Sequence, residues 1–591
     1  MRKNLLRLRK FAALFVACLG LAFLLVYIQW NVYRPLDASS YDRDRPKILV
    51  NQVGYLPKQT KVALLANFKG NDAQTVELVE VTTQKVLLAV PAAIGVRDKL
   101  SNEVLQAVDF SNFDREGEYI LRIGDLKSVP FPIGKQVYEK PLAVLLRSYY
   151  LQRCGVAIAD PVTGISHPPC HLKDAALAHS DSQHKEGTQL QSLGGWHDAG
   201  DYGKYVATAT ITIGRLLHLY EKHPNLFSDG QLQIPESGNR VPDLLDEMQV
   251  GLDWLLTMQR ADGAVYRKLS GKNWPIGLAP DKDTQSRFIY GVSTPETAKF
   301  SATMAIAARV YLPFQKERAA IYLAAAKFAW QYLETQPVMQ IDKVDGDDSG
   351  SGGYLYSDID NEASLLTDTD DRLWAAAELW ITTEGTKFQQ YFTEHVDGFA
   401  YTLFEWKDPS PLALTSILEQ EKAFISPDIK DKIKRKILHR AEGLLQKVNS
   451  SGYRLANHRL IWGSNKMAAE EGITLAYAYQ LTQNPAFRNA AIAQLDYLFG
   501  RNPFNQTFVT GIGTNPVRKT NHLFARATAI YIPGLVVGGP NRGAQDGIAP
   551  KERGLWSYID DERSYATNEY AIDYNASLVV LMGEVLSFMP T

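Results

Sequence analysis

The chain has 591 residues, a formal net charge of −2 and an aromatic content of 10%. This length exceeds what one compact core usually holds, so we expect two domains, one of them large. A nucleic-acid-binding protein needs a basic excess that this composition lacks, so we expect no nucleic-acid partner.

The N-terminus has the features of a membrane-insertion segment. Several basic residues precede an apolar run at residues 11–28, which is near the length needed to cross a bilayer, and no small-x-small cleavage motif follows it. We predict a signal-anchor at residues 1–34, with a cleaved signal peptide as the alternative, and a polar tether at 35–46. The rest of the chain would be exported. It would be anchored to the inner membrane and face the periplasm or the extracellular side, or be secreted if the segment is cleaved.

Residues 47–136 have a strand-like pattern. Short, branched and partly alternating segments such as 76–81 and 119–123 are separated by turn signals such as Arg115-Glu116-Gly117. The length and the pattern predict a small β-sandwich.

From residue 137 onward the pattern changes to long amphipathic helices. An alanine-rich helix, a polar turn and a second helix ending in aromatic residues recur at 305–330, 374–392 and 475–499. Repeated helical hairpins over residues 137–591 predict a closed helical toroid or a solenoid.

The most informative segment is the run GGWHDAGDYGKY at residues 194–205. Two carboxylates, Asp198 and Asp201, lie among glycines that permit close approach of a ligand and aromatic rings on which a sugar can stack. Such a pair could hold a water molecule and take a proton from it. In the alternative reading, Asp201 caps the following helix and Asp198 is a solvated loop acid.

A second acidic segment lies near the C-terminus, where Glu569 precedes a strongly apolar final helix. Taken alone, this glutamate could simply complement the dipole of that helix. Taken with Asp198 and Asp201, it supplies the second half of a carboxylate pair.

Three further groups of residues are typical of metal ligands. Two thiols and two imidazoles make a tetrahedral zinc set, although a disulfide between the two cysteines is an alternative; these residues are Cys154, Cys170, His171 and His197. An oxygen-rich segment before a helix could offer ligands to a hard cation, although acids in a first helical turn are the alternative; its residues are Glu236, Asn239, Asp243 and Asp246. Acids recur ahead of another helix at Asp368, Asp370 and Asp371.

Together these motifs resemble family nine of the glycoside hydrolases, in the subgroup with an N-terminal immunoglobulin-like module. The resemblance runs from about Ile48 to the C-terminus. The matching motifs are GGWHDAGDYGKYV at 194–206, IPESGN at 234–239, WGSN at 462–465, GRNP at 500–503, and NEY and YNA at 568–570 and 574–576.

The resemblance implies a multidomain chain: a small all-β immunoglobulin-like sandwich followed by a large all-α (α/α)6 barrel. It implies an inverting glycoside hydrolase that cleaves β-1,4-glucosidic bonds, of the endoglucanase type, acting on cellulose or a related β-glucan. Asp201 matches the general base, Asp198 the acid that helps to hold the attacking water, and Glu569 the general acid. The two carboxyl groups of an inverting pair must stand about 6.5–9.5 Å apart. The resemblance also implies structural zinc on the two cysteines and two histidines, and calcium at the two acid-rich segments.

One segment departs from the family pattern. A His-His-Arg-like run that binds sugar hydroxyls usually follows Asn-Pro-Val-Arg, and here the corresponding residues are Asn521, His522 and Leu523. Loss of a hydrogen-bonding arginine should change the accepted sugar. An exo-acting β-glycosidase on short or amino-sugar oligosaccharides, resembling a glucosaminidase, is therefore the alternative function.

The expected sugar contacts are Trp196, Tyr202, Arg518, His522 and Tyr565. Two other classes of protein predict different features. A catalytically silent carbohydrate-binding protein predicts loss of at least one acid, and all three are present. A zinc hydrolase predicts an open coordination position, which four protein ligands would fill.

Overall fold

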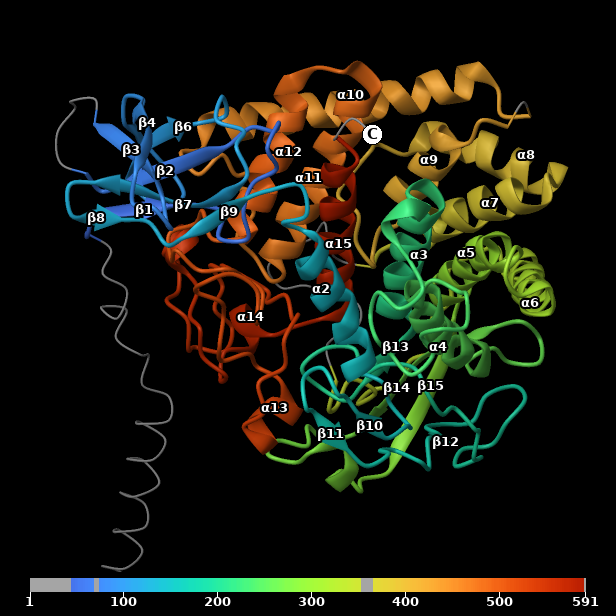
Figure 1. The fold of residues 1–591 in the computed structure, drawn as a ribbon. Coiled ribbons are helices and arrows are strands. Elements are labelled where there is room, and N and C mark those ends of the chain that lie inside the picture. The colour runs from blue at the N-terminus through green and yellow to red at the C-terminus, as the bar shows by residue number, and fades with distance from the viewer. Residues whose placement is uncertain (1–43, 69–73, 352–364, 423, 589–591) are drawn as a thin grey trace, which may run out of the picture.

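The computed structural model describes residues 44–68, 74–351, 365–422 and 424–588. A β-sandwich at the N-terminal end packs against a larger helical body (Figure 1). The predicted signal-anchor at 1–34 and most of the tether at 35–46 lie outside the described residues. Within the described ranges, no helix combines the length and the apolar character that crossing a membrane requires.

The N-terminal domain consists of two facing antiparallel sheets, as predicted. One sheet has the order β1-β2-β6-β5, and the other has the order β4-β3-β7-β8 with β9 also paired to β7. The strands are β1 (Lys47–Leu49), β2 (Val62–Ala66), β3 (Thr75–Glu80), β4 (Val86–Pro91), β5 (Val96–Arg97), β6 (Val104–Asp109), β7 (Gly117–Ile123), β8 (Leu126–Lys127) and β9 (Phe131–Ile133).

Side-chain alternation explains the sandwich. In β3, Val76 and Leu78 are fully buried while Thr75 is exposed, which is the period-2 pattern of a strand with one face on a core. The rings of Tyr55, Phe110 and Phe131 pack together in that core, with centroid separations of 5.2–5.8 Å. The aromatic cluster therefore holds the two sheets face to face.

The helical domain arranges its helices in inner and outer layers. The helices are α2 (Glu139–Leu151), α3 (Val206–Lys222), α4 (Asp243–Thr257), α5 (Thr294–Tyr311), α6 (Lys316–Thr335), α7 (Thr369–Thr383), α8 (Thr386–His395), α9 (Ser410–Glu419), α10 (Pro427–Ser450), α11 (Ser464–Thr482), α12 (Pro485–Leu498), α13 (Leu523–Thr528), α14 (Tyr565–Asn568) and α15 (Ile572–Leu586). Short 3-10 turns lie at Pro224–Leu226, Pro280–Lys282, Val396–Gly398 and Gly554–Trp556.

The inner helices contact one another in sequence. Helix α3 packs on α5, α5 on α7 and α7 on α9, while α11 packs on α15, which returns to α3. Outside them α4, α6, α8, α12 and α2 each cover an inner helix, and α10 lies against α9 and α11. Helix α5 is buried on nearly every face whereas α6 and α10 are buried along one stripe, which is how the sequence sets inner and outer positions.

The helical domain also contains a four-stranded sheet, which corrects the prediction of an all-α domain. Its order is β12-β15-β14-β13, and a separate β10-β11 ribbon accompanies it. Of its main strands, β15 is rich in β-branched and aromatic residues that favour extended backbone, and β14 begins with Val265 and Tyr266. The bounds are β10 (Ile158–Ala159), β11 (Ser166–His167), β12 (Ala176–Leu177), β13 (Lys204–Tyr205), β14 (Val265–Gly271) and β15 (Arg287–Ser293).

Buried polar contacts fix the sandwich on the helical domain. The Asn51 amide donates to Asp496 Oδ1 at 2.9 Å, and the Tyr453 hydroxyl donates to Glu103 Oε2 at 2.6 Å. All four side chains are largely or fully buried. Because a buried polar group left without its partner is costly, these contacts define one relative orientation of the two domains.

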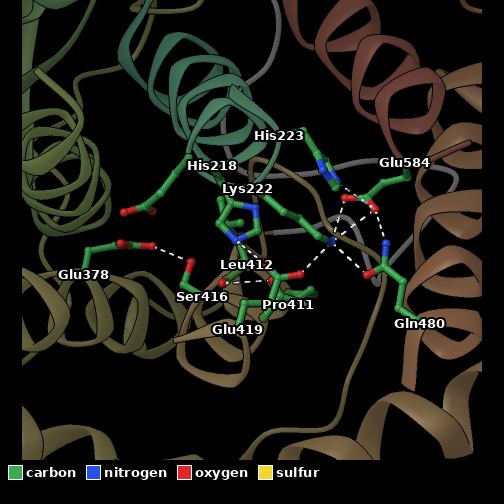
Figure 2. A network of polar contacts seen from close by, with 12 residues as sticks. His218, Lys222, His223, Glu378, Pro411, Leu412, Ser416, Glu419, Gln480 and Glu584 are labelled. Atoms are coloured by element: carbon green, nitrogen blue, oxygen red, sulfur yellow. Dashed lines mark hydrogen bonds and ion pairs between the residues drawn. The ribbon is translucent and has the colours of Figure 1, made fainter. Parts of the chain in front are cut away.

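A network of buried charges ties the inner helices together at the C-terminal end of α3 (Figure 2). Lys222 Nζ lies 2.7 Å from Glu419 Oε1 and 2.9 Å from Glu584 Oε1, and it also donates to Gln480 Oε1 at 2.9 Å. His218 Nε2 lies 3.0 Å from Glu419 Oε2. The acid-bearing loop precedes the other end of α3, so this network closes the end of the helical domain opposite that loop.

Candidate active site

The segment between Gly194 and Tyr205 forms a tight loop that leads through β13 into α3. The Asp198 amide donates to Gly203 O at 2.9 Å and closes it. Gly200 has no room for a side chain, because an added Cβ would lie 2.2 Å from Asn521 O and 3.1 Å from Glu569 Oε1. The glycine therefore allows the acid loop and the C-terminal segments to approach each other closely.

Backbone pairing brings Glu569 to this loop. The loop residue Ala199 forms an antiparallel bridge with Ala571, and the Ile572 amide donates to Asp198 O at 2.8 Å. Glu569 itself forms a parallel bridge with Asn521. The acids at the two ends of the helical domain are therefore held in one place by main-chain contacts rather than by flexible side chains.

The three acids have different surroundings. Asp201 Oδ2 accepts a hydrogen bond from the Tyr205 hydroxyl at 2.5 Å, while Asp201 Oδ1 is buried without a hydrogen-bond partner among the described residues. Asp198 Oδ1 accepts a hydrogen bond from the Thr208 hydroxyl. Asp201 thus has one oxygen fixed by a phenol and a second, buried oxygen that accepts no hydrogen bond from the described residues.

Burial and mutual repulsion perturb all three carboxyl groups. Burial, and then the charges of Asp201 and Asp198, raise the pKa of Glu569 well above its usual range. Burial, and then the charge of Asp573, raise the pKa of Asp198. Burial also raises the pKa of Asp201, but the hydrogen bond from Tyr205 opposes that shift. Glu569 is the group most suited to keep its proton, and Asp201 the one helped to release it.

These acids line a cavity of about 920 Å³. Aromatic side chains form much of its wall, namely Trp274, Trp406, Trp462 and Tyr565. The rings of Trp462 and Tyr565 lie 5.6 Å apart with an interplanar angle of 32° and are both partly exposed. Aromatic faces beside an acid pair are suited to binding sugar rings.

The predicted sugar contacts fall into two groups. Tyr565 lines the cavity, as expected. Trp196 and Tyr202 do not line it, which corrects the expectation for them: the Trp196 indole is buried and donates to Glu247 Oε1 at 2.8 Å, and the Tyr202 hydroxyl donates to Leu278 O at 2.7 Å. Both rings belong to the hydrophobic core of the helical domain.

His522 and Arg518 also lie outside the cavity lining, which corrects the remaining expectations. His522 is buried, its Nε2 lies 3.1 Å from Gln152 Oε1, and burial lowers its pKa to about 3. Arg518 is exposed on the surface. Asn521, at the first position of the altered segment, does line the cavity.

Sequence reasoning missed several residues in the cavity wall. Trp274, Trp406 and Glu405 line it, and Lys466 Nζ lies 3.0 Å from Asp573 Oδ2 at its edge. Asp573 follows Glu569 by four positions, a spacing that could have indicated it. No local pattern marked the two tryptophans, because only the tertiary fold brings their loops to the acids.

The four predicted zinc ligands form one buried cluster. Their candidate ligand atoms all lie within 4.8 Å of one another. The two sulfur atoms are 3.9 Å apart, far beyond disulfide length, so the disulfide alternative is wrong in this structure. Cys154 Sγ lies 3.6 Å from His171 Nδ1, and His171 Nδ1 lies 3.3 Å from His197 Nε2. A tetrahedral ion with bonds of about 2.3 Å to sulfur and 2.0–2.1 Å to nitrogen would give similar edges.

The two acid-rich segments differ in how well they fit a cation. In the first, Glu236 is bound to Arg153 and Asp243 accepts from backbone amides and a serine, whereas Asp246 accepts from Asn239 and keeps one buried oxygen without a partner.

In the second segment, both carboxylate oxygens of Asp370 are buried without a hydrogen-bond partner among the described residues. Asp371 faces the Lys299 ammonium at 2.5 Å. Asp370 therefore offers two oxygens to a hard cation, whereas Asp371 is already paired with an ammonium group.

Comparisons with known proteins agree with the architecture. The profile of glycosyl hydrolase family 9 matches residues 138–582, and that of the cellulase N-terminal Ig-like domain matches residues 43–128. The chain is 32% identical over 553 residues to endoglucanase D of Acetivibrio thermocellus, covering 92% of this chain and 84% of that one. It is 30% identical to a xyloglucan-specific endo-β-1,4-glucanase of Bacteroides ovatus, covering 90% and 92%. A crystal structure of a metagenome-derived family 9 endoglucanase superposes with a TM-score of 0.87 at 40% identity, covering 92% of this chain and 99% of that one.

Proposed function

Because the chain belongs to glycosyl hydrolase family 9, we propose that it is an endo-β-1,4-glucanase that hydrolyses cellulose or a related β-glucan with inversion at the anomeric carbon. The observation that carries this proposal is the convergence of Asp201 and Glu569 on one aromatic-lined cavity. Three relatives at 30–32% identity are named endoglucanase D, xyloglucan-specific endo-β-1,4-glucanase and cellodextrinase. The first two names support this substrate class.

In this mechanism Asp201 is the general base. Its unpartnered Oδ1 takes a proton from a water molecule while Tyr205 holds Oδ2, and the water oxygen forms a bond to the anomeric carbon. Asp198 helps to hold that water beside Asp201.

Glu569 is the general acid. Burial and the neighbouring carboxylates keep its proton in place until the glycosidic carbon–oxygen bond breaks. The proton then passes to the leaving oxygen, so one proton is given up at Glu569 and one is gained at Asp201. The enzyme returns to its starting state when the two groups re-equilibrate with solvent.

The altered segment favours a second candidate, an exo-acting glycosidase on short or amino-sugar oligosaccharides. His522 points away from the cavity toward Gln152, and Asn521 lines the cavity at the start of that segment. A site that lacks hydrogen-bonding groups to certain hydroxyls discriminates against sugars that need them. Product profiles on cellohexaose and on chitosan oligomers separate the two candidates.

We also propose the domain limits and barrel type expected from the sequence. The inner and outer helix layers support closure as an (α/α)6 barrel over residues 137–591, after an immunoglobulin-like domain at 47–136. Export is supported by the basic and apolar pattern at the N-terminus.

Zinc is our proposal for the Cys/His cluster, because two thiolates and two imidazoles at tetrahedral spacings suit that ion. Its ligands would be Cys154, Cys170, His171 and His197, and with four protein ligands its role would be structural. A structure similar to this one belongs to a Zn-binding triple mutant of a family 9 endoglucanase. Calcium is our proposal for Asp370 and Asp371.

The test of the main proposal is a pair of isosteric variants, Asp201→Asn and Glu569→Gln, assayed on cellohexaose with anomer-resolved NMR. We expect the wild type to release the α-anomer first and each variant to lose activity by about 10³-fold or more while remaining folded. Initial release of the β-anomer by the wild type, or near-wild-type rates in either variant, would refute the assignment.

A further inference from the structure

A loop between β14 and β15 carries an unusual set of exposed hydrophobic side chains. Trp274, Ile276 and Leu278 are 47%, 65% and 41% exposed, respectively. Two of them, Trp274 and Ile276, line the cavity that contains the acids, and Leu278 does not. Large apolar side chains kept in solvent beside a cavity indicate a surface that a ligand covers.

The loop is closed on itself by polar contacts. The Gln285 side chain accepts from the Asn273 amide at 3.1 Å and donates to Asn273 O at 3.1 Å. It also donates to Asp283 Oδ2 at 3.0 Å. The exposed hydrophobic side chains therefore lie on a loop whose conformation is held by hydrogen bonds within it.

Two anchors join this loop to the segments beneath it. The Tyr202 hydroxyl, next in sequence to Asp201, donates to Leu278 O at 2.7 Å. On the other side Asp283 Oδ2 lies 3.5 Å from His171 Nε2, and both side chains are almost fully buried. The loop is thus fastened both to the acid loop and to the Cys/His cluster.

His171 contacts both the Cys/His cluster and the loop, so the position of the cluster can affect the position of the loop. Its Nδ1 faces Cys154 Sγ and His197 Nε2, while its Nε2 faces Asp283. The Tyr202 ring packs against both imidazoles, with centroids 5.7 Å and 4.9 Å away. A histidine that binds an ion through one nitrogen is usually oriented by a carboxylate at the other.

We propose that Trp274 and Ile276 form an apolar platform for a sugar ring of the bound chain, and that Asp283 is a positioning residue that holds the platform in place through His171. This rests on the proposed function and adds a specificity determinant to it. Because the platform and the acids lie on different loops of the same cavity, we expect it to strengthen the binding of oligosaccharides long enough to contact both.

The direct test uses binding without turnover. In the Glu569→Gln background, calorimetry compares cellohexaose and cellobiose binding with and without Trp274→Ala, with Leu278→Ala as the matched control on the same loop. We expect Trp274→Ala to weaken cellohexaose binding about tenfold, which corresponds to about 1.4 kcal/mol, because the ring no longer covers the sugar, and Leu278→Ala to leave it unchanged.

Equal cellohexaose affinity with and without Trp274 overturns the platform and leaves the proposed function intact. Absence of any cellohexaose binding by Glu569→Gln overturns the proposed function, and the platform with it.

The positioning role is tested with Asp283→Asn, which keeps the side-chain shape. We expect a raised KM for cellohexaose with kcat within about twofold, an unchanged content of bound metal, and faster tryptic cleavage after the exposed Lys272 in the loop. A fall in kcat at constant KM, or unchanged KM and proteolysis, overturns the role of Asp283.

Discussion

The hydrogen bond between Tyr205 and Asp201 offers a direct test of the base assignment. The phenol hydroxyl donates to Asp201 Oδ2 at 2.5 Å, and burial is the main influence that opposes ionisation of this aspartate. Tyr205→Phe removes the donor and keeps the ring. We therefore expect Asp201 to lose its proton at higher pH in the variant.

The size of the shift follows from the strength of such bonds. A hydrogen bond to a charged acceptor contributes about 1.5–3 kcal/mol, which corresponds to about one to two pKa units. The Tyr205 bond favours the ionised form and lowers the pKa of Asp201, so its loss raises that pKa. Because the base must be ionised, the acidic limb of kcat/KM should move upward by about one to two pH units.

The assay is the pH dependence of kcat/KM on a soluble oligosaccharide, with Tyr202→Phe as the control. The Tyr202 hydroxyl donates to a backbone carbonyl rather than to an acid, so its removal should leave the acidic limb where it is in the wild type. An acidic limb unmoved by Tyr205→Phe would show that Asp201 is not the base. Equal shifts in both variants would point to a general disturbance of the loop.

Four further outcomes follow from the structure. Glu569→Gln should abolish turnover yet match or exceed the wild-type melting temperature in calorimetry, because it replaces a buried carboxyl group that must take up a proton on folding at neutral pH. Lys222→Met should lower the free energy of unfolding by about 1.5–3 kcal/mol in urea titrations, because the buried Glu584 and the partly buried Glu419 lose the ammonium that they share, and a loss below about 1 kcal/mol would contradict the network. Burial opposes ionisation of Glu419 and Glu584, but the Lys222 ammonium holds the pKa of each below its usual range. The stability that the two carboxylates contribute is therefore present above about pH 4.5 and should be lost as the pH falls through their pKa values in the folded protein. Glu419→Gln should make the free energy of unfolding less dependent on pH in that acidic range. Cys170→Ser, or removal of the metal by a chelator, should lower the melting temperature while kcat on a short substrate changes little, and unchanged melting with the metal retained would refute the structural role.

Motifs with fixed local spacing were the parts of the site that could be predicted from sequence. Asp198 and Asp201 lie on one glycine-rich loop whose backbone needs glycine at Gly200, so the motif and its conformation are inseparable. The Cys/His cluster was predicted for a similar reason, since two of its members are adjacent and His197 lies inside the acid-loop motif. The β-sandwich followed from alternation that a single strand already displays.

Residues without a local signal were missed or misplaced. Trp196 was expected to contact sugar because it adjoins the acids, but its indole N–H donates a hydrogen bond to Glu247 in the protein interior. Trp274 entered the site only because strands β14 and β15 place its loop over Tyr202. That sheet was itself missed, since the antiparallel pair β14–β15 interrupts a helical pattern and its outer strands, β12 and β13, have only two residues each. Local sequence motifs therefore predicted the catalytic carboxyl groups better than they predicted the residues that line the cavity around them.

The distribution of the acids over two distant segments has a physical reason. An inverting pair needs one ionised and one protonated carboxyl group in the same cavity, so the two must have different surroundings. Asp201 receives a phenol donor from its own loop, whereas Glu569 is faced mainly by the backbone near Gly200 and by other carboxylates. Placing both groups on one short loop would give them similar burial and similar donors, and their pKa values would stay close together. Backbone bridges between the acid loop and the C-terminal segment instead hold the two groups side by side while each keeps its own environment.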